Sequence, residues 1–186
     1  MATEIGHWMN GKDSPLEGKI NLSGASGLGK PLQLNSWVSS LGPLFNFEQF
    51  EILELADKYA IIKAYWVALR HLYERDFTDH KNSLLLSSVG VYALNLLLAD
   101  ICEWHSANVA TVKDAVSRYL EPLKDFNWSK NGPNPTPIKG LGGSSGVTAA
   151  YRILLEWLAK GGIEEASRKL GKLNGLDTGI QKEIAK

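Results

Sequence analysis

The sequence has little cysteine, no excess of charge of either sign and no leader-like segment. Its single cysteine, Cys102, excludes an internal disulfide framework and suits a reducing compartment. Twenty basic residues balance twenty acidic ones, which argues against a surface that coats nucleic acid broadly but leaves room for a local basic patch. The first residues contain neither a basic region nor an apolar core, so we expect no signal peptide and a cytoplasmic protein.

Long apolar runs are also scarce, and the one at residues 84–101 is nearly long enough to span a bilayer. It contains Ser87, Ser88, Asn95 and Asp100, and it lacks the flanking aromatic belt and basic cluster of a membrane helix. We therefore predict a buried central helix and no membrane association, with membrane insertion as the alternative.

Apolar residues recur at steps of three and four along most of the chain, which is 44% hydrophobic. This spacing predicts a mainly α fold, a helical bundle of about five to seven helices. It is strongest over 47–75, where the helix is either continuous or broken near Asp57, over 82–102, and over 148–160, which Gly161 and Gly162 stop.

A small β element is expected near the N-terminus. The stretches LEGKINL and PLQLN alternate in polarity on either side of a glycine-rich turn, which predicts a small β-hairpin at about 16–35. We expect residues 1–162 to form a single helical domain, followed by a polar C-terminal helix and tail over 163–186.

The glycine-rich turn, GASGLGKP, resembles a phosphate-binding loop because Gly24, Gly29 and Lys30 fit the G-x-x-x-x-G-K frame. Such a loop continues with Ser or Thr and opens a helix, so that backbone N–H groups hold phosphate. Here Pro31 supplies neither a hydroxyl nor an N–H group, and the alternating segment PLQLN follows. We interpret this stretch as a turn.

A second glycine cluster, KGLGGSSGVT, lies directly before the predicted helix at 148–160. Free N–H groups at a helix start can hold an anion, and a flexible loop with a serine cap is the alternative. The candidate anion- or nucleic-acid-binding residues here are Lys139, Gly140, Gly142, Gly143, Ser144 and Ser145.

The cluster ends a long loop, residues 124–146, which is too long for a plain connection in a compact domain. In it, Trp128 lies among Lys124, Lys130 and Lys139. An aromatic ring among lysines can stack on a base while the lysines hold phosphates. The alternative is that Trp128 fixes the loop to the core.

The chain offers little for catalysis or metal binding. Cys102 and His105 are three residues apart, but no second Cys/His pair accompanies them, so we expect no structural zinc site. No nucleophile and base accompany either glycine loop. We predict no metal, no cofactor, no catalytic residue and no enzymatic activity.

Several segments together resemble the C-terminal half of DGQHR-domain proteins in order and spacing. They are WMNGKDSPLEGKINL, AYWVALRHLY, SSVGVYALNLLLADI, DFNW and GLGGSSG, and the resemblance covers residues 5–160. That family includes proteins associated with bacterial DNA phosphorothioation and related modification systems. Its Asp-Gly-Gln-His-Arg signature belongs to an upstream ParB-like α/β core and is absent here, so no catalytic role of that core carries over.

The resemblance implies a helical module, whether a separate small protein or a fragment, that acts in a bacterial DNA-modification or defence system. We expect it to bind DNA or a protein partner without catalysis, through Lys124, Trp128, Lys130, Lys139 and the glycines before Val147. Two alternatives remain from the residues themselves. The apolar helices suit a self-assembling structural protein, and the glycine loops suit a phosphate-binding enzyme.

Overall fold

The computed structural model describes residues 1–25, 29–105, 109–131 and 133–184. Within these ranges the protein is mainly helical, as predicted, with ten α-helices, one 3₁₀ helix and two very short strands. In chain order they are α1 (Ala2–Asn10), β1 (Ile20–Asn21), β2 (Leu32–Gln33), α2 (Leu34–Ser40), α3 (Gly42–Phe45), α4 (Glu48–Glu51), α5 (Leu55–Leu72), α6 (Glu74–Thr78), α7 (Ser88–Trp104), α8 (Val109–Leu120), η1 (Glu121–Leu123), α9 (Gly143–Lys160) and α10 (Glu164–Ile184).

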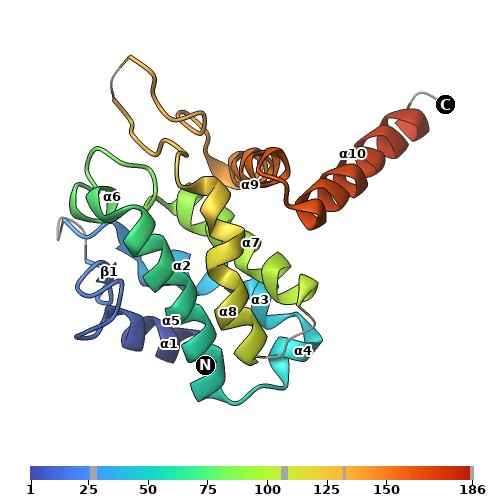
Figure 1. Ribbon diagram of the computed structural model, residues 1–186. Helices are drawn as coiled ribbons and strands as arrows, with labels where there is room; N and C mark the ends of the chain where they lie inside the picture. Colours follow the sequence, from blue (N-terminus) through green and yellow to red (C-terminus); the bar gives the residue numbers. More distant parts are fainter. Residues whose placement is uncertain (26–28, 106–108, 132, 185–186) are drawn as a thin grey trace.

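Helix α7 runs through the middle of the fold (Figure 1). It packs against α9 on one side and against α2, α3 and α8 on the others. The core is continuous, because fully buried side chains come from five separate helices: Ile5, Trp37, Ile62, Leu94 and Leu154. A helix that is apolar around its circumference has to be covered on all sides, which explains this arrangement. No helix in the described ranges is both long and apolar enough to cross a membrane.

The start of α7 is fixed by a serine cap and by one glycine. The Ser87 hydroxyl accepts a hydrogen bond from the backbone N–H of Gly90, a common way to satisfy a free helix N–H. A Cβ at Gly90 would lie 2.3 Å from the carbonyl oxygen of Leu84. Only glycine fits this close approach, so the helix begins at Ser88 rather than at residue 82.

The two strands correct the prediction of a hairpin. β1 pairs with β2 in parallel, with Ile20 opposite Leu32 and Asn21 opposite Gln33. Parallel pairing needs a connection that returns to the end where the first strand began. Strands of two residues are so short that the segment between them is long enough to make this return. The expected small β element is present, but it is not a hairpin.

The helical region 47–75 is broken before Asp57, between α4 and α5. The break is held by Lys58, whose side chain is only 2% exposed. Its ammonium donates a hydrogen bond of 2.7 Å to the carbonyl oxygen of Glu51, the last residue of α4, and lies 6.0 Å from the centre of the Phe45 ring. A cation at a helix C-terminus satisfies a free carbonyl and interacts favourably with the helix dipole.

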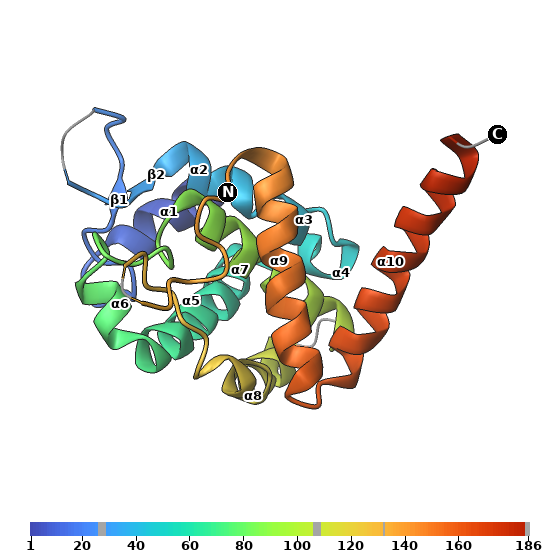
Figure 2. The ribbon, with the colours of Figure 1, turned by 90° about the horizontal axis from the view of Figure 1, so that it is seen from above.

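Helix α9 begins at Gly143, earlier than the predicted start at residue 148, and ends at Lys160 before Gly161 and Gly162 as predicted. The polar C-terminal helix is α10. Its first half packs against α9, and its second half extends away from the rest of the fold in Figure 2. The division of the chain at residue 162 into a domain and an appendage stays a prediction.

We expect Lys58→Met to lower the free energy of unfolding by about 1–3 kcal/mol, because the carbonyl oxygen of Glu51 at the end of α4 loses the buried ammonium that donates to it. Urea unfolding measures the change. The matched control is Lys63→Met on the same helix, a half-buried residue whose ammonium lies 5.7 Å from the centre of the Tyr59 ring. Equal losses in the two variants would contradict the role given to Lys58.

We expect Asn95→Ala to cost at least about 2 kcal/mol, because it leaves two buried groups without their partner. The Asn95 side chain accepts from the Trp66 indole N–H at 3.1 Å and donates to the Ser40 hydroxyl at 2.7 Å. Thermal and urea unfolding test this. The exposed Asn46→Ala should change stability by less than about 0.5 kcal/mol.

Candidate nucleic-acid interface

Two loops that are far apart in sequence pair at one end of the molecule. Residues 79–84, which follow α6, lie alongside the start of the long loop that leads to α9 (Figure 1). Ser83 and Ser129 form an antiparallel bridge, and the N–H of Leu84 donates to the carbonyl oxygen of Trp128 at 2.8 Å. The N–H of Lys130 donates to the carbonyl oxygen of Asn82, also at 2.8 Å. Backbone pairing thus fixes the two loops relative to each other.

Side chains strengthen this pairing and bring two lysines to the same place. The Lys130 ammonium donates to the carbonyl oxygen of Lys81 at 2.9 Å, and the Asn131 amide donates to the Asn82 side-chain oxygen at 2.9 Å. On the other flank, the His80 imidazole lies 3.2 Å from the carbonyl oxygen of Gly29. The segment 79–83 therefore joins both loops that the sequence singled out.

The long loop is also bonded to itself. The Asn127 amide donates to the carbonyl oxygen of Asn134 at 2.5 Å, and the N–H of Thr136 donates to the carbonyl oxygen of Ser129 at 2.8 Å. The Thr136 side chain is buried. Lys139 follows and is exposed. We call Lys81, Lys130 and Lys139 the cationic loop surface.

Trp128 requires a correction, because its side chain is only 1% exposed. Its ring centre lies 4.7 Å from that of Phe126 and 5.9 Å from that of Tyr73. Phe126 in turn packs on Trp157 of α9 at 5.4 Å. A nucleic-acid base has no access to a ring enclosed in this way. Trp128 is the aromatic residue that fixes the loop to the core, which was the alternative interpretation.

Lys124 differs from the three lysines of the cationic loop surface because it is paired with a carboxylate. It is exposed and forms an ion pair of 2.8 Å with Glu121, which is also exposed. This neighbouring carboxylate raises the pKa of Lys124 and offsets its charge. Such surface pairs add little stability, and the paired lysine offers a phosphate less than an unpaired one does.

The second glycine cluster forms the first turn of α9. Gly142 is the N-cap residue and no side chain caps the helix. Gly143, Ser144 and Ser145 follow and are exposed. Gly140 has a φ of 83°, a conformation that suits glycine. The predicted helix start therefore carries uncapped backbone N–H groups at the surface, in the arrangement that favours an anion.

The first glycine cluster opens no helix in its described residues. Lys30 directs its ammonium to the carbonyl oxygen of Ile20 at 3.3 Å, and strand β2 follows Pro31. The next helix, α2, starts only after that strand. Residues 26–28 of GASGLGKP lie outside the described residues. A phosphate-binding loop is followed at once by a helix, whereas this segment is followed by strand β2. The described residues therefore do not form such a loop.

No group of three histidine, cysteine, aspartate or glutamate side chains suited to a metal occurs in the described part of the chain. Cys102 is buried, and burial raises the pKa of its thiol to about 12. His105 instead lies 2.9 Å from the Tyr119 hydroxyl. Cys102 thus lies in the core, whereas His105 contacts Tyr119.

Sequence reasoning missed a buried polar network at Asp100 of α7. Asp100 is 5% exposed. Its carboxylate accepts a hydrogen bond from the Tyr151 hydroxyl of α9 and pairs with the Lys169 ammonium of α10 at 2.7 Å. Burial raises the pKa of Asp100, while the bonds from Lys169 and Tyr151 act in the opposite direction. An acid inside an apolar run was the available signal, but its partners lie more than fifty positions away.

We expect Tyr151→Phe to lower the free energy of unfolding by about 1–3 kcal/mol at pH 7, because a buried carboxylate loses a donor. The hydrogen bond from Tyr151 favours the charged form and so lowers the pKa of Asp100. Its contribution is therefore present above that pKa and disappears as the pH falls through it. Urea unfolding at pH 7 and pH 4 measures this. Tyr92→Phe, at a half-buried residue outside the network, should show no such difference between the two pH values.

Comparison with models of known protein families, with curated proteins and with solved structures finds no match for this chain.

Proposed function

We propose that this chain is a non-enzymatic DNA-binding module of a bacterial DNA-modification or defence system, acting in the cytoplasm. The proposal rests on the cationic loop surface, and above all on the fixed position of Lys81 beside Lys130. The resemblance to the C-terminal half of DGQHR-domain proteins supplies the biological setting. No chemical step is required of the chain.

The geometry supports phosphate binding because the loops are held before any ligand arrives. Two backbone hydrogen bonds, which together form the Ser83–Ser129 bridge, connect residues 82–84 to 128–130. Lysines carried on such loops lose less conformational entropy on binding than lysines on a mobile tail. Lysine–phosphate contacts supply most of the sequence-independent affinity of a protein for DNA.

The uncapped start of α9 adds a second kind of phosphate contact. The loop that carries Lys130 and Lys139 leads directly into Gly142 and Gly143. Backbone N–H groups at a helix start contact DNA phosphates in many complexes and set the orientation of the protein on the duplex. One continuous segment, 130–145, thus offers both ammonium and N–H donors.

Acidic groups close to this surface limit its affinity. Asp79 lies at the start of the same segment as Lys81, and its two carboxylate oxygens accept from the Asn82 amide at 3.0 and 3.1 Å. Its negative charge opposes an approaching phosphate. This local mixture of charges, together with the balanced total, suits moderate, salt-sensitive binding rather than tight coating of DNA.

The experiment is an anisotropy titration of labelled duplex and single-stranded DNA over a series of salt concentrations. We expect binding at low salt tighter than ~10 µM. Lys81→Ala, Lys130→Ala and Lys139→Ala should each weaken binding. On duplex DNA, each should also reduce the slope of log K against log salt by about 0.9 for every phosphate that the removed ammonium had neutralised.

The matched control is Lys160→Ala, at the opposite end of α9 from Gly143, which should leave the slope unchanged. Asp79→Asn should tighten binding. Absence of salt-dependent binding at low salt, or an equal loss in the Lys160 variant, would refute the proposal.

A further inference from the structure

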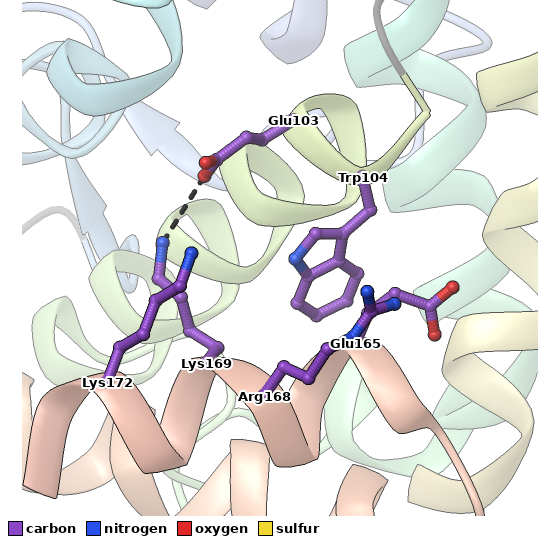
Figure 3. A pocket seen from close by; sticks show the side chains of 6 residues that line it. All are labelled: Glu103, Trp104, Glu165, Arg168, Lys169 and Lys172. Atoms are coloured by element: carbon purple, nitrogen blue, oxygen red, sulfur yellow. Dashed lines mark hydrogen bonds and ion pairs between the residues drawn. The ribbon is translucent and has the colours of Figure 1, made fainter.

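A cleft lies between the first half of α10 and the end of α7, and it is open to solvent. It has a volume of about 240 Å³ and is lined by Glu103, Trp104, Glu165, Arg168, Lys169 and Lys172. Figure 3 shows Trp104 pointing from α7 toward α10, with Lys169 and Lys172 on one side of its ring and Arg168 and Glu165 on the other. Both helices therefore contribute to one site, separate from the cationic loop surface.

One wall of the cleft is fixed by ion pairs. Lys169 forms ion pairs with the buried Asp100 at 2.7 Å and with Glu103 at 3.3 Å. Two carboxylates thus share one ammonium, and Tyr151 also donates to Asp100. These contacts hold α10 in place and leave Lys169 without a role for a ligand.

The opposite wall is fixed in the same manner. Glu165 accepts a hydrogen bond from the Tyr119 hydroxyl at 3.2 Å. A backbone hydrogen bond lowers the pKa of Glu165 most, and the Tyr119 hydroxyl and the nearby Arg118 and Arg168 lower it further. Trp104 packs against Tyr119 with ring centres 5.3 Å apart. The indole is therefore held in one position by Tyr119, and it is half-buried rather than enclosed.

Two further cations, Arg168 and Lys172, line the cleft. They lie one turn apart on α10 and are exposed, and neither makes a hydrogen bond or an ion pair with a residue that the structure describes. Arg168 does lie close enough to Glu165 to help lower the pKa of that carboxyl. Both flank the Trp104 ring. A fixed aromatic face between two such cations suits a planar group that carries a negative charge, because the ring stacks and the cations hold the anion.

We propose that this cleft binds a small anion built on one planar aromatic ring system, which carries a single carboxylate or phosphate group either directly or through a sugar, with the ring on Trp104 and the anion between Arg168 and Lys172. The ligand is a free small molecule, since the volume holds a single ring system and its anionic group. Two sources share this chemistry, a nucleoside monophosphate and an aromatic carboxylate.

Isothermal titration of the full chain distinguishes them with four probes, adenosine 5′-monophosphate, 4-hydroxybenzoate, adenosine and inorganic phosphate. We expect one of the first two to bind with a dissociation constant below ~1 mM, at least about tenfold tighter than adenosine or phosphate alone. The tighter of the two identifies the source.

Variants test the assigned contacts. Arg168→Ala and Lys172→Ala should each weaken binding about fivefold or more, and Trp104→Leu should abolish it while Trp104→Phe retains part of it. Circular dichroism checks that each variant is folded, and Lys160→Ala is the matched surface control. Absence of saturable binding by any probe, or binding that the Arg168 and Lys172 variants leave unchanged, would overturn the proposal. The DNA titration is read separately, so failure of one proposal does not decide the other.

Discussion

The need to cover α7 on every side is the constraint on which the rest of the structure depends. Two buried polar side chains then fix how the covering helices sit. Asn95 bonds to Trp66 and Ser40, which precede α7 in the chain, whereas Asp100 bonds to Tyr151 and Lys169, which follow it. Apolar packing alone tolerates many rotations of one helix on another. Buried polar groups reject rotations that leave them unpaired, so α7 connects both halves of the chain in one arrangement.

Sequence reasoning recovered what depends on local spacing. The apolar periodicity predicted a mainly α fold, the presence of helices within 47–75 and 82–102, and the end of α9 at Lys160. It failed where contacts distant in sequence decide the outcome. The strands are parallel because the chain between them returns so that Leu32 lies opposite Ile20. The break before α5 depends on Lys58, whose ammonium donates to the carbonyl oxygen of Glu51. The start of α7 at Ser88 reflects the close approach at Gly90.

At the candidate site, too, the sequence predicted what depends on local composition and failed where distant contacts decide. Lysines, glycines and an aromatic residue in a long loop indicated a binding segment, and the loop proved to be a built structure. Composition gave no means of telling Lys130, which pairs with a loop 49 residues away, from Lys124, which pairs with its neighbour Glu121. It also gave no means of seeing that Tyr73 and Phe126 enclose Trp128. Exposure is a tertiary property, and it decides which members of a motif remain accessible to a ligand.

The central position of α7 has a consequence for synthesis of the protein. Its cover on one side, α9, begins at Gly143, whereas α7 ends at Trp104. At translation rates of about 5–20 residues per second, the intervening chain takes ~2–8 s to emerge from the ribosome. During that interval Leu97, Leu98 and Ile101 belong to a helix that is still partly uncovered. The nascent chain thus exposes its most apolar segment for seconds before α9 is available to cover it.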